Sequence, residues 1–145
     1  MSTEPDPTSR KKILVVDDNQ IILKTISMKL QTSGYEAFTA LDGAEAVAVL
    51  RKIRPDLVLL DIAFPPDVSG MSWDGFRIMD WLRRVDETQK IPIIVISGVL
   101  EEKCKQRALD NGAVAFFSKP VNFDEMLKVV RATLDSNERK PSSAS

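Results

Sequence analysis

The chain of 145 residues carries a net charge of −1, and 43% of its residues are apolar and 28% charged, as in an average globular domain. This small net charge gives no electrostatic reason to expect direct binding to nucleic acid or to an anionic membrane. The chain has no apolar run long enough to cross a membrane and no secretory signal at its start, so we expect a cytoplasmic protein.

Two residue counts narrow the possible chemistry. Cys104 is the only cysteine, which excludes an internal disulfide and fits a reducing compartment. The chain has no histidine, which excludes Ser-His-Asp catalysis, most zinc chemistry and an intrinsic phosphohistidine. If a histidine supplies a phosphoryl group to this protein, that histidine belongs to another molecule.

Five alternations of strand and helix are predicted along the chain. Apolar runs predict strands at 13–16, 35–39, 57–60, 91–96 and 114–117. Helices are predicted at 19–33, 43–53, 75–86, 101–111 and 122–135, with Gly34 and Gly112 as C-terminal stops and Asn122 as an N-cap. This alternation predicts an α/β fold, a doubly wound domain whose parallel sheet has helices on both faces.

The two ends of the chain differ in composition from the region between them. Residues 1–11 are rich in Pro, Ser, Thr and charge, which predicts a disordered N-terminal arm. Residues 137–145 predict a flexible C-terminal tail or a linker severed from a longer protein. The folded domain is expected at 12–136, and we expect it to have no output domain of its own.

Four of the predicted strands lead into polar or charged residues. Asp17 and Asp18 follow ILVV, Asp61 follows LVLL, Ser97 follows IIVI, and Lys119 comes soon after VAFF. Because the carboxyl ends of parallel strands converge on one crevice, we expect these side chains to meet there. Three carboxylates repel one another unless a cation neutralises them, so the pattern predicts a divalent-metal site that handles a phosphoryl group.

These residue types suit phosphoryl transfer to a carboxylate. A hard cation such as Mg²⁺ prefers oxygen ligands, and an ionised Asp61 can act as the nucleophile without a base. The metal ion and Lys119 would neutralise the developing charge, and the Ser97 hydroxyl would donate a hydrogen bond to a phosphoryl oxygen. Each residue alone also has a plainer explanation, since Asp17-Asp18 could form a turn and a helix N-cap and Asp61 could simply end a strand.

The motifs ILVVDDN, LVLLDI, IIVISG and FFSKPV, in this order, resemble the response-regulator receiver domain, the phospho-acceptor module of two-component signalling. The resemblance covers about residues 12–135 and implies a flavodoxin-like strand order 2-1-3-4-5. It implies phosphorylation of Asp61 with bound Mg²⁺. For the metal ion it implies Asp18 as direct ligand, Asp17 as ligand mainly through water, and Asp61 and the main-chain carbonyl of Ala63 as further ligands. It implies Lys119 as phosphate-binding cation, with a cis peptide between Lys119 and Pro120. It also implies two switch residues, Ser97 through its hydroxyl and Phe116 through its aromatic ring. The plainer explanation for Phe116 is an ordinary core or surface aromatic.

The same resemblance implies the partners. A histidine kinase or histidine phosphotransfer protein would donate the phosphoryl group, and the output would be contact with a downstream protein or onward phosphotransfer, from a monomer or a weak phosphorylation-dependent dimer. Beyond its own phosphorylation and slow dephosphorylation, we expect no enzyme activity. The alternative is a phosphorylation-independent interaction module with the same fold. A metal-dependent phosphatase fits less well, because that class has Asp-x-Asp after the first strand instead of the adjacent Asp17-Asp18.

Two departures from the family pattern concern the surroundings of Asp61. The segment PDVSGMSW, within residues 65–73, is an insertion that either is a neutral surface loop or shapes partner choice. Ala63 and Val99 stand at positions that tune dephosphorylation in the family, and because both are apolar they predict slow self-hydrolysis.

Apolar residues exceed one stripe on the first predicted helix. Ile22, Ile26 and Leu30 form a core-facing stripe, while Ile21, Leu23 and Met28 fall outside it. These three extra residues could form a partner face, or the helix could be more buried than its spacing suggests.

Overall fold

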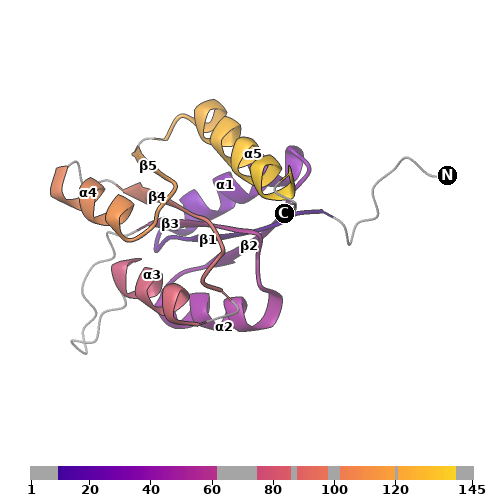
Figure 1. The fold of residues 1–145 in the computed structure, drawn as a ribbon. Coiled ribbons are helices and arrows are strands. Elements are labelled where there is room, and N and C mark those ends of the chain that lie inside the picture. The colour runs from indigo at the N-terminus through magenta and orange to yellow at the C-terminus, as the bar shows by residue number, and fades with distance from the viewer. Residues whose placement is uncertain (1–9, 62–74, 86–87, 98–101, 120, 140–145) are drawn as a thin grey trace.

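Five parallel strands form one sheet in the order β2-β1-β3-β4-β5, which confirms the predicted fold and strand order (Figure 1). The computed structural model describes residues 10–61, 75–85, 88–97, 102–119 and 121–139, and for 75–77, 102–104 and 136–139 only the main chain. In chain order the elements are β1 (Lys12–Val16), α1 (Gln20–Thr32), β2 (Glu36–Ala40), α2 (Gly43–Ile53), β3 (Leu57–Asp61), α3 (Gly75–Arg84), β4 (Ile93–Ser97), α4 (Glu102–Asp110), β5 (Ala115–Ser118) and α5 (Phe123–Arg139).

Helices cover both faces of the sheet, and each face has its own apolar core. Val58 and Leu60 of β3 pack in the core beneath α2, α3 and α4, whereas Leu57 and Leu59 pack in the core beneath α1 and α5. Figure 1 shows α1 and α5 on one side of the sheet and α2 and α3 on the other. Burial on both faces explains why the strands read as continuous Val, Ile and Leu. None of the helices that the structure describes has the length and apolar character needed to cross a bilayer.

Local signals set the ends of several helices. At the end of α1, Gly34 adopts a φ of 98°, and the main-chain N–H groups of Gly34 and Tyr35 donate to the carbonyls of Gln31 (3.1 Å) and Leu30 (3.0 Å). A glycine is favoured there because a residue with a Cβ is strained at positive φ. At the start of α5, the side chain of Asn122 accepts a hydrogen bond from the main-chain N–H of Glu125 at 3.1 Å, as predicted for an N-cap.

Three element boundaries differ from the prediction by two residues or more. Strand β4 begins at Ile93 instead of 91, because the main-chain N–H of Ile91 donates to the carbonyl of Thr88 in the preceding turn and Pro92 has no N–H to donate. Helix α3 ends at Arg84 instead of 86. The Thr88 hydroxyl donates a hydrogen bond to the carbonyl of Leu82 at 2.8 Å, in place of a further main-chain N–H of the helix. Helix α5 continues to Arg139, beyond the predicted end near 135, because no proline or glycine lies between Asp135 and Pro141.

The buried face of α1 was predicted wrongly at one position. Leu23, Ile26 and Leu30 are the buried side chains, and Ile22 is only half-buried. Ile21 and Met28 are exposed, by 76% and 57%. Helix α1 therefore places Leu23 in the core, and leaves Ile21 and Met28 at the surface.

Candidate functional site

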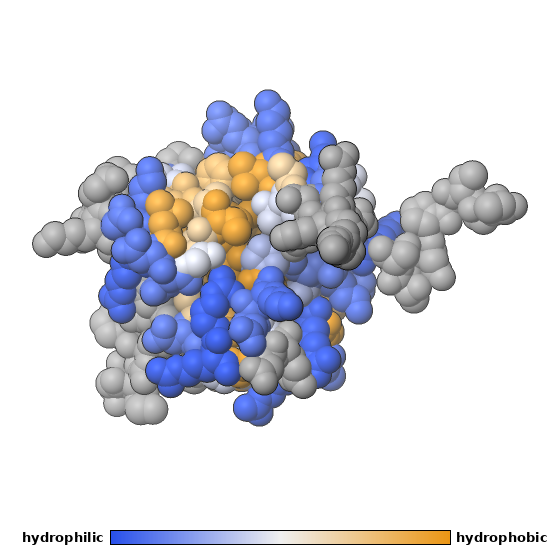
Figure 2. Space-filling model, in the orientation of Figure 1, coloured by the Kyte–Doolittle hydropathy of each residue, from blue (hydrophilic) through white to orange (hydrophobic). Residues whose placement is uncertain are grey.

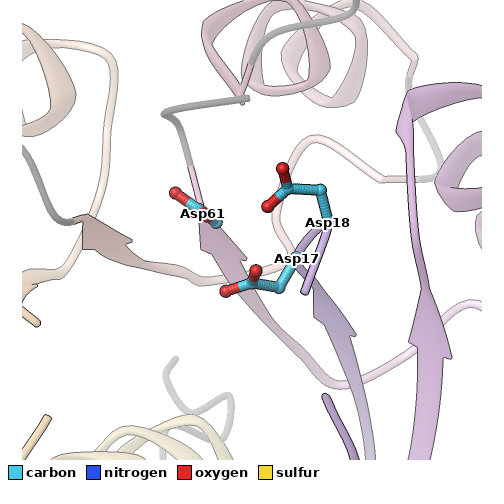
Figure 3. Close-up of side chains that lie close together, drawn as sticks. All are labelled: Asp17, Asp18 and Asp61. Carbon is cyan, nitrogen blue, oxygen red and sulfur yellow. The ribbon is translucent and has the colours of Figure 1, made fainter. Parts of the chain in front are cut away.

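Three carboxylates meet at the carboxyl edge of the sheet, as the sequence predicted. Asp61 ends β3, and Asp17 and Asp18 follow β1, which pairs directly with β3. One carboxylate oxygen from each lies within 4.8 Å of the others (Figure 3). Asp17 and Asp61 are each only 2% exposed, whereas Asp18 is exposed. The site therefore has a buried, negatively charged floor with one carboxylate open to solvent.

Lys119 joins the two buried carboxylates. Its Nζ atom donates to Oδ2 of Asp17 at 2.9 Å and to Oδ2 of Asp61 at 3.0 Å. Burial alone would lower the pKa of Lys119, but its hydrogen bonds to Asp17 and Asp61 and the charges of both carboxylates raise it above its ordinary value. Lys119 is therefore a cation at neutral pH, and it balances part of the charge of the site.

The main chain of Lys119 is tied to β4. Its N–H donates to the carbonyl of Ser97 at 2.9 Å, and Ser97 lies opposite Ser118 in the register of β4 and β5. Ser97 is fully buried at the end of β4. The main chains of the two residues that were predicted to act on the same group are thus adjacent, with Ser97 at the end of β4 and Lys119 directly after β5.

Asn19 is a residue of the site to which the sequence analysis assigned no role. Its main-chain N–H donates to Oδ1 of Asp17 at 2.9 Å, and its own side chain caps α1 by accepting from the N–H groups of Ile21 (2.9 Å) and Ile22 (3.2 Å). The plainer explanation, in which Asp17-Asp18 form a turn and the helix N-cap, is therefore wrong about the cap, which is Asn19. An Asn directly before the helical pattern was the available signal, since Asn is a preferred N-cap.

Phe116 lies in the middle of β5, opposite Val95. It is half-buried and packs against the core beneath α2, α3 and α4. This packing fits an ordinary core aromatic and also a side chain that moves between two positions, so its switch role stays a prediction. Ala63, Val99, Pro120 with its peptide bond to Lys119, and the insertion at 65–73 lie outside the described residues.

The negative charge of Asp18 is destabilised in the metal-free site. Partial burial and repulsion by the charge of Asp17 raise the pKa of the Asp18 carboxyl above its ordinary value, and the charge of Lys119 opposes this only in part. A carboxylate set that is not fully neutralised by Lys119 fits a hard divalent cation, because such ions are bound by oxygen ligands and keep several waters.

Replacing Asp18 by asparagine should stabilise the metal-free protein. Because the pKa is raised in the fold, the charged carboxylate opposes folding at pH values above about 3.9, and this effect disappears as the pH falls below that value. We expect Asp18→Asn to raise the free energy of unfolding at pH 7 by less than about 1 kcal/mol. Urea denaturation with a chelator measures this change. Asp135→Asn, at an exposed position of α5, is the control, and a lower stability of Asp18→Asn would contradict the proposed repulsion.

Comparisons with known proteins agree with the geometry. Residues 13–131 match the family model of the response regulator receiver domain. The chain is 33% identical over 133 residues to the DNA-binding dual master transcriptional regulator RpaA of Synechocystis, and the match spans 92% of this chain but only 53% of RpaA. It is 31% identical over 124 residues to the polar-differentiation response regulator DivK of Brucella anthropi, across 86% of this chain and 96% of DivK.

Solved structures show the same relationship. The chemotaxis protein CheY4 of Vibrio cholerae superposes with a TM-score of 0.76 at 31% identity, over 86% of this chain and 98% of CheY4. A CheY-like receiver domain protein of Methanospirillum hungatei gives a TM-score of 0.80 at 27% identity, over 91% of this chain and 99% of its own. With the sequence motifs, the fold and the acidic site in agreement, the chain belongs to the response regulator receiver domain family of two-component signalling.

Proposed function

We propose that this protein is the phospho-acceptor switch of a two-component or phosphorelay pathway, and that a partner phosphohistidine phosphorylates Asp61. The observation that carries this proposal is the position of Asp61, a buried carboxylate between the Lys119 ammonium at 3.0 Å and the acidic pair Asp17-Asp18. Receiver domains act as signalling switches and bind Mg²⁺ through an acidic pocket, and this chain has such a pocket.

The reaction needs no base from the protein. An oxygen of the ionised Asp61 carboxylate forms a bond to phosphorus, while the phosphorus–nitrogen bond of the donor breaks and the leaving imidazole takes a proton from solvent. Lys119 stays within reach of the new phosphoryl oxygens because Asp17 also holds its Nζ atom, at 2.9 Å. Most of the catalysis is then positioning and charge neutralisation, as expected for phosphoryl transfer.

The hydrogen bonds and the exposure of each carboxylate support a role for each in binding the metal ion. Asp17 has both oxygens hydrogen-bonded, to the Asn19 N–H and to Lys119, which favours a contact with Mg²⁺ through water. Asp18 is the exposed carboxylate and would bind the ion directly, together with Asp61 and the main-chain carbonyl of Ala63. The ion would neutralise charge on the transferring group.

Phosphorylation would then act on residues near Asp61. Ser97, at the end of β4, would donate its hydroxyl proton to a phosphoryl oxygen, and Phe116 on the neighbouring β5 would follow it inward. The phosphorylated form would favour one of two conformations, because only that conformation makes these contacts.

The exposed part of α1 is the proposed contact for the phosphodonor. Ile21 and Met28 are exposed by 76% and 57%. Beside them, a groove of about 440 Å³ runs to Lys119 and is lined mainly by apolar residues, Ile22, Val121 and Phe123 among them. A donor helix seated here would bring its histidine to the edge of the sheet where Asp61 lies.

Ile21→Glu should therefore slow phosphorylation by a protein donor. We expect roughly a tenfold slower transfer, since a buried apolar contact at the centre of an interface is replaced by a charge. Transfer would be measured from a panel of phosphorylated histidine kinases and phosphotransfer proteins, and phosphorylation by acetyl phosphate should not change. Ala48→Glu, at an exposed position of α2, is the matched control. Equal rates of transfer to the Ile21→Glu and Ala48→Glu variants would show that α1 is not part of the interface.

The output is proposed to be protein contact or onward phosphotransfer. Apolar surface gathers between α4 and α5 over β5 (Figure 2). Leu109 in α4 and Val114, directly before β5, are exposed by 38% and 49%. Exposed apolar patches of this kind are typical of protein interfaces. The alternative function, an interaction module that works without phosphorylation, would use the same surface but leave the acidic site unused.

Intact mass after incubation with acetyl phosphate distinguishes the two functions. For a working receiver domain we expect the mass of one added phosphoryl group with Mg²⁺ and none with a chelator. A protein that gains no phosphate from acetyl phosphate or from any donor of the kinase panel, although it is folded, would contradict the proposed function and favour the interaction module. The rate at which the added mass is lost then tests the slow self-hydrolysis predicted from Ala63 and Val99.

A further inference from the structure

Arg83, in the last turn of α3, makes an unusual set of contacts. All four hydrogen bonds that the structure describes for its guanidinium go to main-chain carbonyl oxygens. Nη1 donates to Gln89 (2.8 Å) and Ile91 (3.2 Å) in the connection from α3 to β4, and Nη2 and Nε donate to Gly112 (3.2 Å) and Asn111 (3.4 Å) after α4. One side chain therefore ties α3 and the start of β4 to the C-terminal end of α4.

The end of α4 is built to receive this guanidinium. Gly112 has a φ of 101°, and the N–H groups of Gly112 and Ala113 donate to the carbonyls of Leu109 and Ala108, both at 3.0 Å. This arrangement closes the helix and leaves the carbonyls of Asn111 and Gly112 to Arg83. A Cβ atom at Gly112 would lie 3.0 Å from both Nε and Nη2 of Arg83, so the glycine also makes room for the cation. A cation at this end is favoured by the helix dipole.

The side chains of α4 that the structure describes make little contact with the core. Among its side chains that the structure describes, those of residues 105–110, only Ala108 is buried. By contrast, α1 buries Leu23, Ile26 and Leu30. Figure 1 shows α4 at the margin of the molecule. Elements with few buried apolar contacts open locally at a lower free energy than the core, so the described part of α4 depends on how its C-terminal end is fastened.

We propose that Arg83 is the positioning residue that fastens the C-terminal end of α4 to the end of α3 and to the turn before β4. This inference goes beyond the proposed phosphorylation and does not depend on it.

Hydrogen exchange measured by mass spectrometry on the unphosphorylated, metal-free protein tests the proposal. The variant Arg83→Met keeps a side chain of similar length and removes every donor. We expect amides of 102–113 to exchange at least roughly tenfold faster, with no change in β1 and β3. Arg84→Met is the matched control, because Arg84 is the next residue and is exposed. The control should leave exchange in 102–113 unchanged.

Two results would overturn the proposal. One is equal exchange of 102–113 in the Arg83→Met and Arg84→Met variants. The other is faster exchange throughout the sheet, which would make Arg83 a general stabilising residue. If Arg83→Met does not fold, Arg83→Lys carries the same test, since one ammonium cannot reach four carbonyls.

A second variant tests the same contact from the side of α4. Gly112→Ala should also accelerate exchange of 102–113, because a residue with a Cβ is strained at a φ of 101° and the new Cβ also displaces the guanidinium. With Arg83→Met already present, Gly112→Ala should add less than it does alone, since there is no guanidinium left to displace. Additive effects of the two substitutions would contradict a direct link between Arg83 and Gly112. Neither measurement involves Asp61, so a failure here leaves the proposed function untouched.

Discussion

Replacing Asp61 by asparagine is expected to abolish covalent phosphorylation and leave the protein folded. The amide has the shape of the carboxylate but cannot act as a nucleophile, so phosphate incorporation from acetyl phosphate should fall by at least about 10³-fold. The amide oxygen can still accept a hydrogen bond from Lys119, which also keeps its bond to Asp17 at 2.9 Å. Circular dichroism should therefore show the native secondary structure.

The matched control for this substitution is Asp135→Asn. It removes one carboxylate from an exposed position of α5 and should incorporate phosphate like the original protein. Intact mass with acetyl phosphate and Mg²⁺, followed by peptide mapping, measures both variants. Phosphate on the Asp61→Asn variant would place the acceptor at another residue and overturn the assignment.

Replacing Lys119 by methionine should affect both chemistry and stability. Methionine keeps the apolar stem but leaves the buried carboxylates of Asp17 and Asp61 without their cation. We expect phosphorylation to slow by roughly 10²-fold, the usual effect of removing one charge-stabilising donor from a transition state. We expect the metal-free protein to lose roughly 1–3 kcal/mol of stability, less than for a fully buried pair because the Lys119 side chain is 23% exposed.

The loss of stability has a defined dependence on pH and on Mg²⁺. Because the pKa of Lys119 is raised in the fold, its contribution is fully present below about pH 10.4 and is lost as the pH rises through the higher folded value. Urea denaturation of both proteins at neutral and at strongly alkaline pH should show the difference shrinking at the alkaline end. Mg²⁺ should stabilise Lys119→Met more than the original protein, because it supplies the missing positive charge.

Lys128→Met is the control for Lys119→Met. Lys128 is exposed on α5, so its replacement should change neither the phosphorylation rate nor the effect of Mg²⁺. If Lys119→Met and Lys128→Met had the same stability at neutral pH, the ion pairs seen in the structure would contribute nothing to the fold.

Features that depend on residues near in sequence were predictable. The apolar runs of the strands, the stops at Gly34 and Gly112 and the N-cap Asn122 depend on propensities that act within a few residues, and all of them appear in the structure. The convergence of Asp17, Asp61 and Lys119 was also predictable, because carboxyl ends of parallel strands meet at one edge whatever the loops between them.

What the sequence could not provide was the orientation of individual side chains. Helix α1 has apolar residues on more than one face, so only packing against the sheet and α5 shows that Leu23 is buried and Ile21 exposed. The roles of Asn19 as cap and of Asp17 as partner of Lys119 depend on hydrogen bonds whose geometry no spacing reveals.

The order of strands and helices, the place of the acidic residues and the family could be predicted, because these follow from local periodicity and from which residue types end each strand. The partners of Arg83, which lie up to 29 positions away in the chain, became clear only from the folded structure. The same is true of the contact of Lys119 with Asp17 across 102 positions. Both contacts are made between elements, and their geometry exists only after the sheet and helices have packed.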